Sequence, residues 1–246
     1  MKTKIKQGIR HLAQKCFGYD LSAIRTKVGD DFLDQKKLLG KIRAPIIFDV
    51  GANIGQTTYK YKKLFQQAEI YGFEPFSEVF ERYAEIFKRD RHVHPEDIAL
   101  SKENGTADFY SNNLHYTNSL LPNNLEYTAG NERYDPIATL RVKTETLDSY
   151  CEKHKIHKIH ILKMDVQGGE LLVLQGSKKM LENGNIDMIF TEVEFLEMYK
   201  NQPLMKDIES FLKPYGFTLH KIYNTANENG VPVAGDALFI HAKISN

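Results

Sequence analysis

Hydrophobic and polar positions follow two different periods along the chain, and segments of the two kinds alternate. Mostly apolar runs that are typical of buried strands occur at 46–50, 69–73, 159–165 and 186–194. Apolar residues at helical spacing occur at 57–65, 78–88, 147–154 and 204–212. Strands that alternate with helices predict a doubly wound, mostly parallel α/β sheet with helices on its faces.

Weaker strand signals lie between and after these runs. Short strands are expected near 92–94, at 106–110 and at 138–142, and two closing strands at 217–222 and 237–242. The closing pair predicts an antiparallel end to the sheet. The stretch 111–136 is different, because it is rich in Asn, Ser, Tyr and Pro and has no clean period. A segment of this kind is typical of a lid, a binding loop or a disordered loop.

Residues 1–43 precede the first strand as a predicted N-terminal helical extension, and 44–246 form the main domain. Between 2 and 16, Lys and Arg residues alternate with an apolar stripe at helical spacing, and a second helix is expected at 31–41. A basic amphipathic helix can pack on a domain edge or lie on an anionic membrane surface. The stripe has few large residues to insert, which favours packing and leaves peripheral contact with the inner membrane surface as the alternative.

Composition narrows the partners and the compartment. The 246 residues carry a formal net charge of +1 at pH 7, which gives no electrostatic argument for nucleic acid as a partner. The two cysteines, Cys16 and Cys151, lie far apart and form no ligand pattern, so a reducing compartment is expected. No run approaches a membrane span and no signal peptide is evident, so we expect a cytoplasmic protein.

A glycine turn joins the first strand to the first helix in the segment FDVGANIGQTT at 48–58. Ligands of open α/β sheets bind outside the carboxyl ends of the strands, which places 49–56 at a ligand. Gly51 and Gly55 have no side chain and so permit a close approach of the backbone. A dinucleotide fingerprint has glycine where this chain has Asn53. The asparagine narrows the room for a pyrophosphate and favours a ligand without phosphates.

Two acids follow at strand ends. Glu74 ends the second strand at about 20 residues after the turn, the interval at which an acid accepts hydrogen bonds from ribose hydroxyls. Asp97, after the third strand, is placed to take an adenine amino group. Either acid alone could equally be a surface carboxylate at a strand end. The turn and the two acids in this order predict a site for a nucleoside.

These motifs together resemble one family. The run FDVGANIGQTT, the FEP at 73–75 and above all LKMDVQGGELLVLQGSKKML at 162–181 are similar to the FkbM-type methyltransferases. The resemblance covers about 44–242 and implies a class I methyltransferase (Rossmann-like) fold with a seven-strand sheet. It implies S-adenosyl-L-methionine as cofactor and O-methylation of sugar or polyketide hydroxyls. The cofactor residues that it implies are Asp49, Gly51, Asn53, Gly55, Glu74 and Asp97.

Acids also gather at the ends of two later strands. Asp165 and Glu192 are expected at the same rim of the sheet, with Glu194 on the same face as Glu192. Buried strand ends rarely carry so many acids without a task, since burying unpaired charge is costly. An alcohol needs a base to remove its proton, and Asp165 is the first candidate and Glu192 the second. Lys163 is expected to pair with either acid or to orient the hydroxyl, and Glu170 to stabilise a helix N-terminus.

Alternatively, these acids could bind a metal ion. Asp165, Glu192 and Glu194 are oxygen ligands of the kind that Mg²⁺ prefers in a catechol-type mechanism. The histidines are scattered over a helix and a strand without zinc-ligand spacing and are expected to be structural, as at His154, His157 and His160. We therefore expect no metal.

The observations predict an S-adenosylmethionine-dependent O-methyltransferase that acts on a hydroxyl of a sugar, glycan or glycolipid-like acceptor. The segment 111–136 is the expected acceptor lid, and its likeliest polar contacts are His115, Tyr116, Asn118 and Ser119. One alternative is an NAD-dependent oxidoreductase, which Asn53 and the lack of a suitably placed Tyr-x-x-x-Lys disfavour. Another is a cofactor-binding module without activity, which the presence of Asp165 and Glu192 disfavours.

Overall fold

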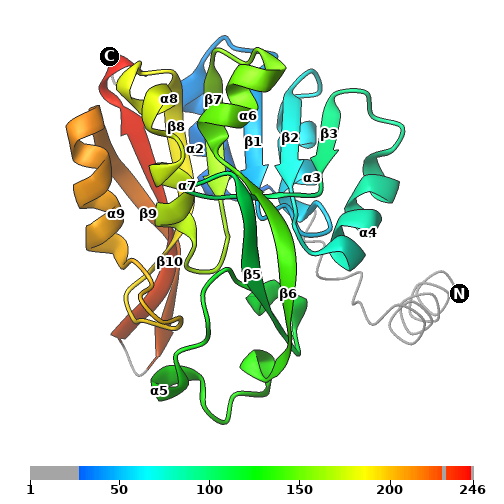
Figure 1. Cartoon of the computed structure of the whole chain (residues 1–246). Coiled ribbons are helices and arrows are strands. Elements are labelled where there is room, and N and C mark those ends of the chain that lie inside the picture. The colour runs from blue at the N-terminus through cyan, green and yellow to red at the C-terminus, as the bar shows by residue number, and fades with distance from the viewer. Residues whose placement is uncertain (1–27, 229–230, 245–246) are drawn as a thin grey trace, which may run out of the picture.

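One seven-stranded sheet forms the centre of the molecule (Figure 1). The computed structural model describes residues 28–228 and 231–244. The strand order is β3-β2-β1-β7-β8-β10-β9; the pairs from β3 to β8 are parallel, and β10 is antiparallel to both neighbours. The strands are β1 Ile46–Val50, β2 Glu69–Phe73, β3 Val93–Glu96, β7 Ile159–Met164, β8 Ile186–Glu194, β9 Phe217–Glu228 and β10 Val231–His241. The predicted sheet and its antiparallel end are confirmed, and both closing strands extend further than predicted.

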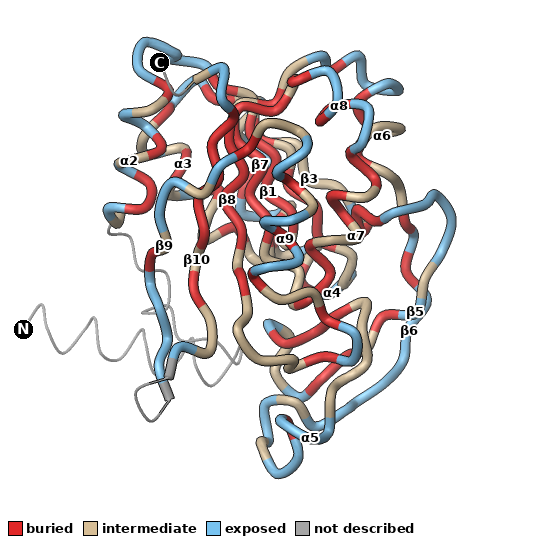
Figure 2. The backbone as a smooth tube through the Cα atoms, turned by 90° about the vertical axis from the view of Figure 1, so that its left-hand side faces the viewer, coloured by how far each residue is buried: buried red, intermediate tan, exposed pale blue. Residues whose placement is uncertain are grey.

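Helices cover both faces of this sheet because side chains along each strand alternate between the faces. Ile47 packs in one buried cluster with residues of α2, α3 and α4, whereas Phe48 packs in the other with residues of α6, α7, α8 and α9. Figure 2 shows the buried residues concentrated along the strands between these layers. The helices are α2 Asp30–Leu39, α3 Gln56–Leu64, α4 Ser77–Phe87, α6 Leu147–His154, α7 Glu170–Gln175, α8 Lys178–Glu182, α9 Met205–Leu212, and the 3₁₀ turns η4 Lys213–Tyr215 and η5 Ala242–Ile244.

A second, three-stranded sheet lies beside the main one. Its order is β4-β6-β5, with the long strands β5 and β6 antiparallel to each other. Its strands are β4 Ala99–Leu100, β5 Gly105–Asn112 and β6 Pro136–Glu145. The strands predicted at 106–110 and 138–142 therefore exist but do not join the main sheet. In Figure 1 they extend from the rim where the main strands end, which is where this fold binds ligands.

The segment 111–136 is ordered by short helices and by side-chain hydrogen bonds. The Asn112 side-chain amide donates to the Thr117 carbonyl at 2.6 Å, and the Asn123 amide donates to Asn112 Oδ1 at 2.8 Å. Asparagine amides thus replace backbone partners, which lets a segment without a hydrophobic period hold a defined shape. Its short helices are η2 His115–Thr117, α5 Leu125–Thr128 and η3 Glu132–Tyr134.

The N-terminal helix α2 packs on the main domain as part of the same core. It was expected at 31–41 and spans Asp30–Leu39. Phe32 is buried, and the Tyr61 hydroxyl of α3 donates to Gln35 Oε1 at 2.8 Å. The basic helix predicted at 2–16, with its membrane contact, lies outside the described residues. Within the part of the chain that the structure describes, no helix is long and apolar enough to cross a membrane.

Candidate active site

The turn after β1 is held in shape by three residues with left-handed backbone. Gly51, Asn53 and Gly55 have φ values of 76°, 51° and 91°. A Cβ at Gly51 would collide with the backbone carbonyl of Asp165, and a Cβ at Gly55 with the Phe87 ring of α4. Asparagine tolerates this backbone region better than most side chains, so it can stand where a glycine is common. Both glycines are therefore required by packing within the protein.

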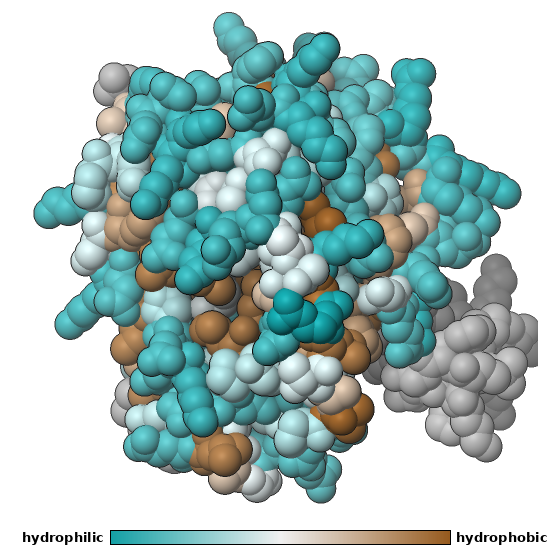
Figure 3. Space-filling model, in the orientation of Figure 1, coloured by the Kyte–Doolittle hydropathy of each residue, from teal (hydrophilic) through white to brown (hydrophobic). Residues whose placement is uncertain are grey.

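A cavity of about 920 Å³, part of its open mouth included, lies at the carboxyl ends of β1, β2 and β7. Figure 3 shows apolar residues gathered in the middle of this face of the molecule, among hydrophilic ones. Five of the predicted site residues line the cavity, namely Gly51, Asn53, Glu74, Asp165 and Glu192. The structure thus brings together residues from four separate parts of the chain.

Glu74 is 8% exposed and holds two backbone segments against each other. Its Oε2 accepts the Asn53 N–H and its Oε1 accepts the Phe76 N–H, each at 3.0 Å. Burial raises the pKa of Glu74 to about 7 against the opposing effect of the two backbone hydrogen bonds. Each carboxylate oxygen has a further lone pair, so Glu74 can also accept a hydrogen bond from a ligand.

Asp97 lies outside this cavity. It is exposed and lines a separate hollow with Pro75, Phe76 and part of β6. The prediction that it contacts adenine finds no support in this placement. The chain turns inward immediately afterwards, and the cavity wall here is instead apolar, formed by Ile98, Ala99, Leu100 and Phe109. An apolar surface is what a purine face packs against. The sequence analysis gave these residues no binding role, although it predicted the strand that contains Phe109.

Asp49 and Lys163 lie behind the cavity wall. Asp49 is completely buried; its Oδ2 accepts the Thr58 hydroxyl at 2.7 Å, and its Oδ1 lies 3.8 Å from Lys163 Nζ. Burial raises the pKa of Asp49, and Lys163 opposes this only in part. Lys163 Nζ also lies 3.3 Å from Asp165 Oδ2. Burial opposes the charge of Lys163, but the two carboxylates outweigh burial and raise its pKa. Lys163 thus pairs with acids, as predicted, but does not line the cavity.

Gln167 joins the two acids that the sequence placed at one rim. Its side-chain nitrogen donates to Asp165 Oδ1 at 3.0 Å and to Glu192 Oε2 at 2.6 Å. The Tyr199 hydroxyl donates to Gln167 Oε1 at 3.0 Å, and the Ser119 hydroxyl to its carbonyl at 2.6 Å. Gln167 has a φ of 53°, an uncommon value for this residue type. No role for Gln167 was predicted, because no local feature of the sequence reveals that its amide bridges Asp165 and Glu192.

The pKa values of Asp165 and Glu192 shift in opposite directions. Burial by itself raises the pKa of Asp165, but Lys163 and the hydrogen bond from Gln167 outweigh burial and lower it. Burial raises the pKa of Glu192 well above its usual range, and the charges of Asp165 and Glu194 add to this. Burial is also the main reason that the pKa of Glu194 rises to about 8. These opposite shifts favour a proton on Glu192 over one on Asp165.

Glu170 supports the turn that carries these residues. It is 4% exposed, and its Oε1 accepts the Val166 N–H at 3.0 Å. Burial raises its pKa to about 7, with backbone hydrogen bonds opposing. The carboxylate therefore satisfies backbone donors at the start of α7, which confirms the structural role expected for it.

A second cavity, of about 1040 Å³ with its open part, adjoins the first. The two cavities share Tyr116, Gln167 and Glu192. The second is also lined by residues of 111–136, of the β8 end and of β10, including Tyr127, Arg133, Tyr134, Glu194 and Met198. Of the expected lid contacts, His115 and Asn118 line the first cavity and Tyr116 lines both. Ser119 is buried, and its hydroxyl donates to the Gln167 carbonyl instead of lining a cavity.

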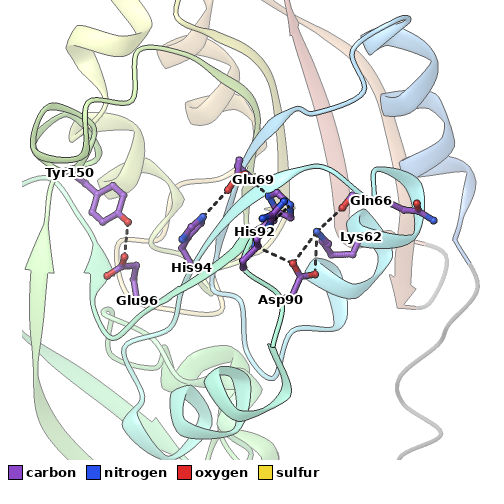
Figure 4. Close-up of polar contacts among 9 residues, drawn as sticks. Lys62, Gln66, Glu69, Asp90, His92, His94, Glu96 and Tyr150 are labelled. Atoms are coloured by element: carbon purple, nitrogen blue, oxygen red, sulfur yellow. Dashed lines mark hydrogen bonds and ion pairs between the residues drawn. The ribbon is translucent and has the colours of Figure 1, made fainter. Parts of the chain in front are cut away.

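His92, His94, His154 and His160 make structural contacts away from these cavities. Figure 4 shows His92 and His94 on either side of Glu69. His92 Nδ1 lies 2.5 Å from Glu69 Oε1, and His94 Nε2 lies 2.8 Å from Glu69 Oε2. His160, one of the three named from the sequence, accepts the Ile46 N–H at 2.9 Å, and the His154 ring stacks on Tyr150. Among the described residues, no three His, Cys, Asp or Glu side chains form a group that could hold a metal ion. That no metal takes part stays a prediction.

Comparison with known proteins adds an independent observation. Residues 49–219 match the family model described as Methyltransferase FkbM domain. The chain is 27% identical over 179 residues to the 2-O-methyltransferase NoeI of Sinorhizobium fredii, which covers 70% of this chain and 72% of that protein. It is 26% identical over 145 residues to the hexuronic acid methyltransferase AglP of Haloferax volcanii, over 58% of this chain and 54% of that protein. A solved structure of a methyltransferase from Streptococcus mutans covers 87% of this chain and 99% of its own at 12% identity, with a TM-score of 0.48.

Proposed function

Because the chain belongs to the FkbM methyltransferase family and is an S-adenosylmethionine-dependent methyltransferase, we propose that its acceptor is a hydroxyl of a sugar or sugar-containing molecule. The observation that carries the proposal is that two cavities meet at Gln167 and Glu192, beside Asp165. One cavity then serves the methyl donor and the other the acceptor. The family membership decides for methyl transfer and against the nicotinamide-dependent alternative.

The first cavity has the features that a nucleoside bearing an amino acid needs. Glu74 offers acceptors for ribose hydroxyls, and the wall from Ile98 to Leu100 offers an apolar surface for the purine. The Asn118 side-chain nitrogen is buried on this wall without an acceptor among the described residues, and a ligand oxygen or nitrogen would satisfy it. Gly51 and Asn53 bring the turn to the same cavity, and we assign these residues to the cofactor. The bound cofactor supplies an electrophilic methyl group.

Asp49 and Gly55 act on the cofactor only indirectly in this proposal. Asp49 is linked to the cavity through Lys163, which lies between it and Asp165. Gly55 allows α4 to pack against the turn. Both are therefore positioning residues.

The second cavity has the features of a sugar site. Tyr127 and Tyr134 offer rings that can pack against the apolar face of a sugar, and Glu194 and Arg133 offer hydrogen-bonding groups. The segment 111–136 covers both cavities and would act as the acceptor lid. The names of two relatives support a hydroxyl of a sugar, since one is a 2-O-methyltransferase and the other acts on a hexuronic acid.

The carboxylate pair supplies the base in this proposal. The nucleophilic oxygen must lie in line with the methyl group and must lose its proton as it reacts. Asp165 and Glu192 face the point where the cavities meet, and Gln167 holds them in one arrangement. Lys163 does not reach the acceptor; it keeps Asp165 ionised and oriented.

The acceptor class can be tested with methyl-labelled S-adenosylmethionine and a panel of acceptors. The panel contains neutral sugar glycosides, uronic acid glycosides, aliphatic alcohols, a catechol and an amine, and mass spectrometry locates the label. We expect a methyl ether on a sugar and none on the amine. Transfer to the amine or the catechol alone, with every sugar inert, would contradict the proposal. As a binding control, calorimetry should detect S-adenosylhomocysteine and not NAD.

A further inference from the structure

The carboxylate of Glu192 lies among an unusual number of other acids. The charged groups that face it come from β7, α7, β8 and β10, and they are Asp165 with Lys163, Glu170, Glu194 and Asp236. Two tyrosines, Tyr134 and Tyr199, approach from the acceptor side. Lys163 is already shared between Asp165 and Asp49. The acids around Glu192 thus outnumber the one lysine among them, and a cation that binds beside Glu192 is favoured.

We propose that Glu192, not Asp165, is the catalytic base, and that the positive charge of the methyl donor decides whether Glu192 carries a proton. Glu192 loses its proton when the positively charged sulfonium binds, and regains one from the acceptor hydroxyl when that charge disappears. The inference rests on the proposed function, which puts the methyl donor beside this pair. It reverses the ranking of the two acids that the sequence suggested.

The geometry separates the two acids into different roles. Asp165 is tied to Lys163 Nζ at 3.3 Å and to the Gln167 amide at 3.0 Å. These contacts lower its pKa against the effect of burial, so it is ionised but holds a proton weakly. Glu192 has the Gln167 amide at 2.6 Å and lies among acids, and burial with their charge raises its pKa. A nearby cation favours the ionised form of such a carboxylate and its removal favours the protonated form.

The chemical step then moves no net charge in the site. The acceptor O–H bond breaks and its proton passes to a Glu192 carboxylate oxygen. The acceptor oxygen forms a bond to the methyl carbon as the carbon–sulfur bond breaks, and the electron pair of that bond stays on sulfur. A carboxylate and a positive sulfur become a carboxylic acid and a neutral sulfur. Asp165 stays ionised throughout, and its negative charge stays paired with the positive charge of Lys163.

The proposal predicts a difference in proton release that can be measured without any acceptor. Calorimetry of the full chain at about pH 7, in two buffers of different ionisation enthalpy, counts the protons released by each ligand. We expect S-adenosylmethionine to release up to about one proton more than S-adenosylhomocysteine. The two ligands have the same amino and carboxyl groups, but the sulfonium charge lowers the amino pKa of the donor, so the protons bound by each free ligand are measured by titration and subtracted.

Variants assign the proton to one residue. In Glu192→Gln we expect the difference to vanish while S-adenosylhomocysteine still binds, because the amide still accepts from Gln167. Glu194→Gln should retain at least half of the difference, and the exposed Glu209→Gln on α9 should match the wild type. Equal release by the two ligands in the wild-type protein overturns the proposal, whether or not any variant folds. A difference that survives in Glu192→Gln, or is lost in Glu194→Gln, overturns the assignment to Glu192.

The test is independent of the acceptor. If the acceptor panel gives no sugar ether but the proton difference is found, the sugar proposal fails and the role of Glu192 stands. If sugars are methylated and the two ligands release equal protons, Glu192 does not exchange its proton with the sulfonium charge.

Discussion

The turn at 51–55 and the segment 111–136 both line the first cavity, and the segment also lines the second, but the two regions are held in place by different means. The turn depends on the backbone, with left-handed residues packed so tightly that Gly51 has no room for a Cβ. The segment depends on side chains, with Asn112 bonded to Thr117 and Asn123. A backbone constraint requires particular residue types, whereas a network of side-chain amides can be built from many sequences. The cofactor side is therefore the more predictable of the two, and the acceptor side the more adaptable.

The largest effect is expected on the turn. Gly51→Ala forces a Cβ into the Asp165 carbonyl at a left-handed position, which should cost at least about 3 kcal/mol of unfolding free energy and abolish S-adenosylhomocysteine binding. The matched control is Gly130→Ala in the segment, where φ is 78° and open space surrounds the position. That change should cost only about 1 kcal/mol. Denaturant unfolding and calorimetry compare them, and equal losses would show that the turn is not specially constrained.

The second effect concerns pH and the turn before α7. The pKa of Glu170 is raised from 4.5 to about 7 by burial, so the folded state keeps this proton to higher pH than the unfolded chain. The stability that this proton contributes is complete below pH 4.5 and is lost as pH rises toward 7. The loss is about 3 kcal/mol for such a shift. Glu170→Gln, which keeps the acceptor for Val166, should remove this loss.

Denaturant unfolding at a series of pH values measures the effect. The control is Glu182→Gln, an exposed change at the end of α8 that should leave the profile unchanged. If Glu170→Gln has the same pH profile as the wild type, the burial of its charge does not limit stability.

A smaller effect should be confined to the segment. Asn112→Ala removes one of the two donors to the Thr117 carbonyl and breaks the amide pair with Asn123, and it should cost about 2 kcal/mol locally. Hydrogen exchange over 113–134 should accelerate, while affinity for S-adenosylhomocysteine falls far less than in Gly51→Ala. Glu126→Ala, an exposed change in the same segment, should change neither. A loss of cofactor affinity as large as that of the turn variant would mean that the two regions are not separable.

The smallest effect tests the residue that connects the two regions. The Tyr199 hydroxyl lies 3.0 Å from both Gln167 Oε1 and the Thr117 carbonyl. Tyr199→Phe removes a hydrogen bond that positions Gln167, which should raise the activation free energy by about 1 kcal/mol. The kcat for an identified acceptor should therefore fall about fivefold, while donor affinity stays the same. Steady-state kinetics and calorimetry measure the two quantities, with Tyr215→Phe on η4 as control. An altered donor affinity with normal kcat would place Tyr199 on the cofactor side.

The fold was largely predictable because burial imposes a period on the sequence. The apolar runs at 46–50, 69–73 and 186–194 became strands with the same bounds. The small sheet and the short helices of 111–136 were not predicted in their arrangement. Their strands are half exposed and their turns are closed by asparagine amides, and neither feature produces a hydrophobic period.

The candidate site was predictable only in part for a related reason. Gly51, Asn53, Glu74, Asp165 and Glu192 could be named because strand ends of a parallel sheet meet at one rim. Asp97 does not line the first cavity, because a single residue beyond a strand can face either way, and its contact with adenine stays a prediction. Gln167 was missed as a bridge because its partners lie on two different strands.

By itself, the sequence determined the sheet, the glycine turn and the set of acids at the rim, since each follows from local period or from residue types that a backbone shape requires. The tertiary structure alone decided in which direction the pKa of each acid shifts. Asp165 lies beside Lys163, and Glu192 lies half-buried among other carboxylates. Two acids of similar local sequence differ because the charge on each depends on neighbours that the fold brings from distant strands.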